Sequence, residues 1–179
     1  MGDKAPMAGK KTKSGGDQGS MEKLLGAVKD TVVRSLVVHD DDLERREARA
    51  MDIRVISPHL TLDRGNFHDT IVANIERGAR YRYLIPDELA VIGAMQRLAA
   101  ELNAAAKPGR KSPAVEWRVV PAACVCFDMV VYDAHTANEE AYLVLPEDSF
   151  TFNLRLQGAF QDRVLGLFTD LWNNSDRLE

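Results

Sequence analysis

Few cysteines, no long apolar segment and no strong net charge set the first limits on this 179-residue chain. Two cysteines are too few for a disulfide scaffold. No apolar run approaches the roughly 18 residues that span a bilayer, and the mean hydropathy is -0.25. The formal charge of -4 and the pI near 5.6 argue against a general polyanion binder, although they leave room for a local basic patch.

Several motifs that would name a chemistry are also missing. The sequence has no P-loop, no GxGxxG and no GxSxG, which removes the commonest phosphate cradles and nucleophile elbows. The composition, 45% hydrophobic and 28% charged, excludes a fully disordered or collagen-like chain. We therefore expect one soluble, cytoplasmic domain that uses no cofactor and no metal.

The first part of the chain differs in character from the rest. Residues 1–20 hold no large apolar side chain except methionine, so we expect a disordered tail, or an expression leader that ends at Gly19-Ser20. They are not a secretory signal, because no apolar core follows the charged start. Apolar residues then recur at helical spacing over 21–38, which predicts an amphipathic helix, and the domain itself is expected over 39–179.

Periodicity and turn residues predict alternating helices and strands in this domain. In chain order these are a short, charged and mostly solvated helix that starts at Asp41, a strand over 53–56, a helix from Asn66 to Gly78, a strand over 81–85, a helix over 87–106, strands over 115–120, 125–132 and 141–145, and a C-terminal helix around Phe168 and Trp172. The first two strands favour a parallel pair with a right-handed crossover, and the last two a hairpin. The prediction is a single α/β (or α+β) domain with a mixed central β-sheet flanked by helices.

A polar loop after the first strand carries the first candidate site, with His59, Asp63, Asn66 and His68. In open α/β sheets ligands bind beyond the carboxyl ends of the strands. Histidine and aspartate there suit acid–base catalysis or metal binding. Alternatively, the loop simply precedes a helix that Asn66 caps.

A second candidate lies on the next strand. Arg80 and Arg82 alternate with Tyr81 and Tyr83, which puts the guanidinium groups on one face of the sheet and the phenol rings on the other. Neighbouring guanidinium groups, with Arg77 close in sequence, suit a phosphate or carboxylate ligand. Alternatively, they form the hydrated face of an ordinary strand.

Polar residues in the strand predicted over 125–132 raise two further questions. Asp128 lies among apolar residues, and because burying an unpaired carboxylate is costly, it needs a partner or an edge position unless it serves a site. Cys124 and Cys126 form no CxxC pair and have no histidine pair nearby, so we expect two buried free thiols rather than a zinc site. Trp117, like the aromatic residues of the last helix, is expected in the core.

The chain also resembles a known family. Its segment 53–86 is similar to the opening half of a phospholipase-D-like domain of bacterial regulatory proteins, with a strand that ends in Ser57-Pro58, a loop with Asp63, a helix with Asn74 and Gly78, and a strand reading YRYLIP. The hairpin with Asp128 and the final helix are similar too, so the resemblance covers about residue 43 to the end. It implies a phospholipase-D-like half-domain.

One departure from that family bears on activity. The family that the chain resembles uses a His-x-Lys-x4-Asp signature for catalysis, in which the histidine attacks phosphorus and the lysine neutralises the phosphate. Here His39, His59, His68 and His135 are followed two places on by Asp, Thr, Thr and Ala. Without the lysine, the resemblance implies a degenerate domain that senses or binds.

Three hypotheses follow. The first is a non-catalytic sensor or regulatory module that binds an anionic small molecule or a protein partner, with nucleic acid less favoured and no membrane; its ligand-binding residues would be His59, Asp63, Asn74, Arg80, Tyr83 and Asp128. The alternative is a hydrolase of phosphodiesters or nucleotides, with His59 or His68 as nucleophile or base and Asp63 or Asp128 orienting it. The third is an assembly protein that forms oligomers, such as a homodimer, through the helix over 21–38.

Overall fold

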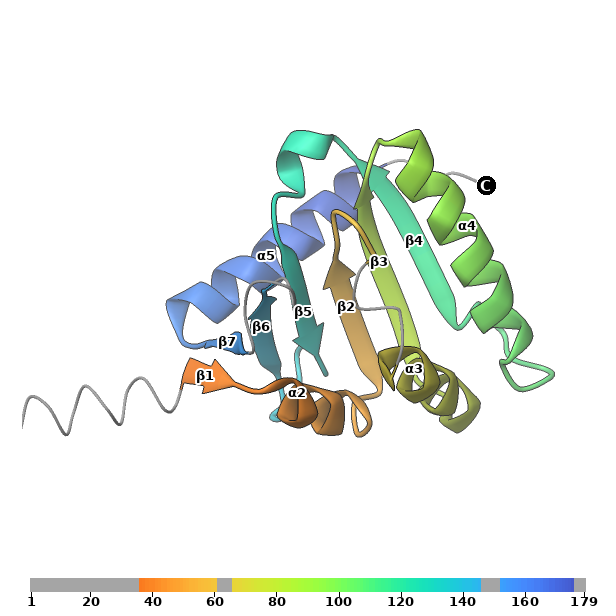
Figure 1. The fold of residues 1–179 in the computed structure, drawn as a ribbon, viewed down its shortest axis with the longest axis horizontal. Coiled ribbons are helices and arrows are strands. Elements are labelled where there is room, and N and C mark those ends of the chain that lie inside the picture. Colours follow the sequence, from red (N-terminus) through yellow and green to blue (C-terminus); the bar gives the residue numbers. More distant parts are fainter. Residues whose placement is uncertain (1–35, 61–65, 146–151, 176–179) are drawn as a thin grey trace, which may run out of the picture. The chain divides into compact units, whose positions relative to one another are not determined.

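A mixed β-sheet organises the domain. In the computed structural model, which describes residues 36–60, 66–145 and 152–175, seven strands lie in the order β1-β7-β6-β5-β2-β3-β4 (Figure 1). The strands are β1 (Val37–Val38), β2 (Asp52–Ile56), β3 (Arg80–Pro86), β4 (Val115–Val120), β5 (Asp128–Tyr132), β6 (Glu140–Val144) and β7 (Asn153–Leu156). The helices are α2 (Asp40–Glu47), α3 (Asn66–Arg77), α4 (Leu89–Ala104) and α5 (Ala159–Asn174), with a 3-10 turn η2 (Ala122–Cys124).

The sheet combines a parallel and an antiparallel half. β2, β3 and β4 are parallel and are connected by α3 and α4. β5 pairs antiparallel with β2, and β6, β7 and β1 continue the sheet antiparallel. The predicted fold class, the parallel opening pair and the β5–β6 hairpin are therefore confirmed.

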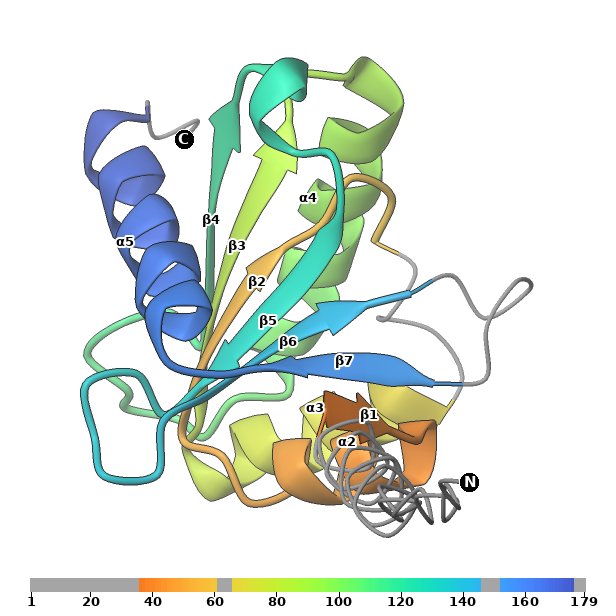
Figure 2. The same ribbon diagram turned by 90° about the vertical axis from the view of Figure 1, so that its left-hand side faces the viewer.

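The two faces of the sheet are covered unequally. Helices α2, α3 and α4 lie on one face and α5 lies alone on the other (Figure 2). The larger core fills the three-helix side, where Ile71 and Met95 pack with Tyr83. On the α5 side, Phe168 packs against Ile56 and Leu84. Trp117 and Trp172 pack against these cores, as expected.

The predicted helix over 21–38 is wrong at its end. Residues 21–35 lie outside the described residues, but Val37–Val38 form strand β1. They pair antiparallel with Leu154 and Asn153 of β7. β-Branched valines favour strands once a partner strand is available, and this pairing outweighs the helical spacing. β7 itself was not predicted either.

The charged helix α2 begins one residue earlier than predicted, and it is not merely solvated. Its N-cap is His39, whose side chain forms no capping hydrogen bond, and Leu43 and Glu47 are buried. On the same helix, Arg46 reaches the β5–β6 hairpin and pairs with Asp133 (3.2 Å) and with Glu140 (2.5 Å). These contacts dock α2 onto the domain.

A buried carboxylate completes this docking. The Glu47 side chain, in a residue only 5% exposed, accepts hydrogen bonds from the hydroxyl groups of Tyr81 (2.9 Å) and Tyr132 (3.0 Å). The Asn74 amide donates to the Glu47 backbone carbonyl (2.8 Å) and to the Tyr81 oxygen (2.9 Å). Burial, reinforced by the Glu47 carboxylate, raises the pKa of Tyr132 well above its ordinary value.

The strand predicted over 125–132 begins only at Asp128. Pro121 ends β4, and the chain then turns through η2 before it reaches β5. Cys124 and Cys126 lie in this connection and are exposed, so the prediction of buried thiols is wrong. The cause is that apolar residues which looked like strand belong to a turn at the surface.

Candidate anion-binding site

Alternation along two neighbouring strands creates a cluster of charge on the α5 side of the sheet. Asp52 and Arg54 of β2 lie directly opposite Arg80 and Arg82 of β3 in the parallel register. The guanidinium group of Arg54 lies over the ring of Phe168 on α5, 5.7 Å from its centroid, which identifies the face. We call this group of four residues the arginine face.

One carboxylate holds two of the three guanidinium groups. Asp52 pairs through one oxygen with Arg54 (3.2 Å) and through the other with Arg82 (3.1 Å). Glu116 of β4 lies opposite Arg82 and adds a second negative charge. The side chain of Arg80 forms no hydrogen bond or ion pair with any described residue. Three cations thus face two anions.

The electrostatics of Arg82 reflect this surplus of positive charge. Burial lowers the pKa of Arg82, the charges of Arg54 and Arg80 lower it further, and Asp52 and Glu116 raise it without restoring its ordinary value. An anion bound beside Arg80 and Arg82 would offset the repulsion between the guanidinium groups. The arrangement is therefore suited to a small anionic ligand.

Tyr83 does not share this site. As the period-two pattern predicts, Tyr81 and Tyr83 point to the opposite face, where both are fully buried. Their rings stack with centroids 6.2 Å apart beneath the helices of the three-helix side. A ligand on the arginine face cannot reach Tyr83 through the sheet.

The histidine loop is not assembled as a catalytic site in the described residues. His59 is exposed, whereas the imidazole of His68 faces carboxylates of α3 and α4, at 3.8 Å from Asp69 and 3.3 Å from Glu101. Asp63 lies outside the described residues, as does the side chain of Asn66.

Asp128 has a structural partner. The hydroxyl group of Ser57 donates to the Asp128 carboxylate and accepts the N–H of Leu60 (2.9 Å). This contact joins the end of β2 to the start of β5, since Ile56 lies opposite Met129. Arg80 lies opposite the first residue of β2, so about 13 Å of strand separates it from this corner. Asp128 and Arg80 therefore cannot serve one small ligand.

Asn74, the remaining candidate, is occupied by the protein. Besides its contacts to Glu47 and Tyr81, its side-chain oxygen accepts a hydrogen bond from Arg77 (2.8 Å). This buried amide supports the core. Nor do the described residues bring three or more His, Cys, Asp or Glu side chains together as a metal site.

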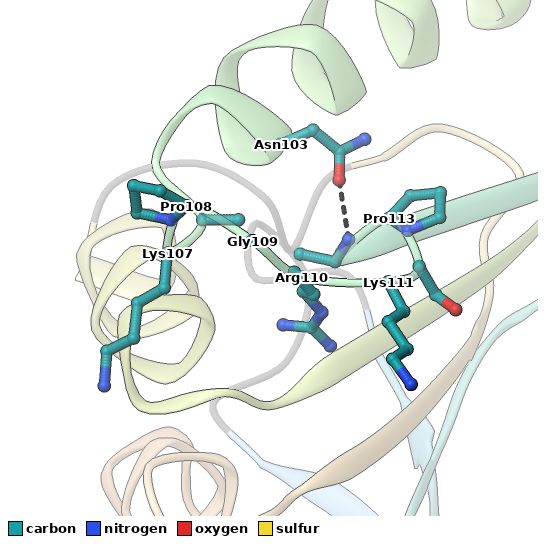
Figure 3. A pocket seen from close by; sticks show the side chains of 10 residues that line it. Asn103, Lys107, Pro108, Gly109, Arg110, Lys111 and Pro113 are labelled. Carbon is teal, nitrogen blue, oxygen red and sulfur yellow. Dashed lines mark hydrogen bonds between the residues drawn. The ribbon is translucent and has the colours of Figure 1, made fainter.

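One hollow at the surface has no counterpart among the sites predicted from the sequence. The loop between α4 and β4 forms an open hollow of about 530 Å³ that is lined by residues 106–114 and Asn103 (Figure 3). Its cations are visible in the sequence KPGRKSP, but nothing in that sequence distinguishes a shaped hollow from a solvated loop. The side chain of Asn103, on the preceding helix, holds the loop in this shape by accepting the N–H of Ala114.

No protein-family model matches the sequence, and no curated protein matches it. Solved structures that are similar in fold include the following two. TrmBL2, an archaeal chromatin protein whose structure shows a novel mode of DNA binding, gives a TM-score of 0.52 at 14% identity over 90% of this chain and 66% of that chain. Nuc from Salmonella typhimurium, a phospholipase D family member, gives 0.51 at 14% identity over 80% of this chain and 96% of that chain. The chain therefore has a phospholipase-D-like fold.

The described helices leave no candidate for a membrane span, because none combines sufficient length with sufficient apolar character.

Proposed function

We propose that this domain is a non-catalytic regulatory module that binds an anionic small molecule at the arginine face. The observation that carries the proposal is the side chain of Arg80, which pairs with no described residue and lies beside Arg82, whose carboxylate partner is already shared with Arg54. Two neighbouring guanidinium groups present a planar set of donors that matches a phosphate or carboxylate.

The absence of the catalytic signature supports binding rather than turnover. None of the four histidines is followed two places on by lysine. The intervals of the signature recur at Cys126, Asp128 and Asp133, with cysteine and aspartate in place of histidine and lysine. A carboxylate at the lysine position would repel a phosphate instead of neutralising it. For the hydrolase alternative, the described residues place His59 at the surface and His68 beside Glu101 (3.3 Å), and Asp63 lies outside them.

The contribution expected from Arg80 determines how much its loss should weaken binding. A hydrogen bond to a charged group contributes about 1.5–3 kcal/mol when its partner is desolvated. Arg80 is only half-buried, so the lower end applies. Loss of its guanidinium group should weaken binding about tenfold.

The test compares Arg80→Ala with a matched control. Arg49→Ala removes an exposed arginine outside the arginine face. Calorimetric titration with nucleotides, cyclic nucleotides and sugar phosphates should give about tenfold weaker binding for Arg80→Ala and no change for Arg49→Ala. Equal affinity in both variants would remove Arg80 from the site. Failure of all these anions to bind the unaltered protein would favour a protein partner instead.

DNA is a second candidate ligand, favoured by one observation. Arg80, Lys107, Arg110 and Lys111 lie at or near the edge where β3 and β4 begin, since Arg110 donates to the carbonyl of Ala79 (3.0 Å). The fold neighbour TrmBL2 binds DNA, which makes this surface worth testing. Fluorescence anisotropy with a short duplex at several salt concentrations would detect such binding as an affinity that falls steeply with salt. Salt-independent or absent binding would count against it.

A further inference from the structure

Side-chain hydrogen bonds hold the α4–β4 loop in the conformation that forms the hollow. Asn103 of α4 holds the far end of the loop, because its side-chain oxygen accepts the N–H groups of Ala114 (2.8 Å) and Val115 (2.9 Å). Its amide nitrogen donates to the carbonyl of Val115 (3.1 Å). In the middle of the loop, Arg110 donates to the carbonyl of Ala79 (3.0 Å). The loop is therefore fixed at its end to α4 and in its middle to the residue that precedes β3.

The size of the hollow fits a small ligand. Its volume of about 530 Å³ lies within the roughly 300–1,000 Å³ of small-molecule sites. Gly109 turns the chain here with a φ of +85°, a conformation that favours glycine.

The charge of the lining has one sign. Lys107, Arg110 and Lys111 are cationic, and none of the ten lining residues is acidic. The two lysines are exposed and form no ion pair with any described residue. In Figure 3 the ends of all three cationic side chains extend to the same side of the loop, with Arg110 between the lysines. A ligand there would meet positive charge without a competing carboxylate.

Backbone donors are also available. The N–H groups of Gly109, Lys111 and Ser112 donate no hydrogen bond to any described residue, whereas that of Arg110 closes the turn over Pro108 and Gly109. Runs of free N–H groups in turns bind anions, because their partial positive charges add and their geometry is fixed in advance. Side-chain cations and main-chain donors together are the combination that binds phosphate groups.

We propose that the α4–β4 loop is a binding site for a phosphate group, held by Lys107 and Lys111 and by the backbone N–H groups of Gly109, Lys111 and Ser112. The residues of this site are not those of the arginine face, although Arg110 contacts Ala79 beside Arg80, and the site does not depend on the small-molecule binding proposed for that face. The phosphate belongs either to a free phosphate or monoester or to the phosphodiester backbone of a nucleic acid.

The experiment is an NMR titration of the full, isotope-labelled chain with inorganic phosphate, a nucleoside monophosphate and a short DNA duplex, each against sodium chloride of equal ionic strength. The amide signals of residues 109–112 should shift and saturate with phosphate but not with chloride. The double variant Lys107→Gln, Lys111→Gln should bind about tenfold more weakly, because it loses two charge-assisted contacts.

Two controls keep this result separate from the arginine face. Arg97→Gln removes an exposed cation of α4 that does not line the hollow and should bind as the unaltered protein does. With phosphate and the monophosphate, Arg80→Ala should also leave these shifts unchanged. Saturation by phosphate or the monophosphate identifies a free phosphate, and saturation by the duplex alone identifies a nucleic-acid backbone. Equal shifts with chloride, or undiminished binding by the double lysine variant, would overturn the proposal.

Discussion

Replacing Tyr132 by phenylalanine tests whether the buried carboxylate of Glu47 holds α2 to the sheet. The Tyr132 hydroxyl donates to Glu47 at 3.0 Å, with the tyrosine fully buried and Glu47 only 5% exposed. A hydrogen bond to a charged group contributes about 1.5–3 kcal/mol, and its loss removes one donor from a buried carboxylate. We expect Tyr132→Phe to lower the free energy of unfolding by about 2–3 kcal/mol, or the thermal midpoint by about 4–12 °C.

Tyr142→Phe on the neighbouring strand is the matched control. The Tyr142 hydroxyl also donates to a carboxylate, that of Glu140 (2.9 Å), but this acceptor is more exposed and keeps its ion pairs with Arg46 and Arg155. Its loss should cost about 1 kcal/mol. Urea unfolding at pH 7, monitored by circular dichroism, measures both. Equal losses in the two variants would refute the role given to Glu47.

Three further outcomes are expected. Burial raises the pKa of Tyr142 to about 12, above the unfolded value of about 10, so the stabilisation it provides is complete below about pH 10 and is lost as the pH rises through 12. In Tyr142→Phe the free energy of unfolding should therefore fall less steeply with pH in that window, by at most about 1.4 kcal/mol per pH unit. An unchanged slope would contradict this. Gly78→Ala should destabilise the protein by about 1 kcal/mol or more, because Gly78 follows the end of α3 with a φ of +112°. Gly93→Ala inside α4 should stabilise it by up to about 1 kcal/mol. Thermal unfolding measures both, and a change in stability of the same sign in the two variants would contradict these conformations. Cys124 and Cys126 should both react with a thiol reagent without denaturant, and protection of either would contradict their exposure.

The parallel half of the fold could be predicted because its signals are local. Ser57-Pro58 follows the end of β2, and Gly78 separates α3 from β3. The apolar residues of these segments recur with a period of two or close to four, which indicates strand or helix locally. The faces of β3 followed from alternation alone, with Arg80 and Arg82 on one side and Tyr81 and Tyr83 on the other.

The antiparallel edge was missed for the opposite reason. β1 has two residues and, among the described strands, pairs only with β7, at the far end of the chain, where Val37 lies opposite Leu154; β7 has four residues and lies between β1 and β6. Alternation of Leu154, Arg155 and Leu156 is the signal that could have revealed β7. For β1, the apolar spacing matches a helix until the partner strand is known.

The candidate site could be predicted residue by residue but not as an arrangement. The expected ligand set joined Asp128 and His59 to Arg80, and the strand register places Asp128 and Arg80 at opposite ends of β2. Which end a residue occupies depends on long-range pairing, which periodicity does not encode. Likewise, the hollow of the α4–β4 loop depends on Asn103, whose amide binds the backbone 11 and 12 residues later along the chain.

A thermal-shift panel of nucleotides, cyclic nucleotides, sugar phosphates and short RNA, with mass spectrometry of each compound afterwards, tests the central claim most directly. A ligand at about 100 times its dissociation constant stabilises the folded state by roughly 2.7 kcal/mol. For a domain of this size that raises the midpoint by about 5–10 °C. Anion binding without catalysis predicts such a shift for at least one compound, its recovery intact, and a reduced shift in Arg80→Ala. Recovery of that compound hydrolysed would contradict it.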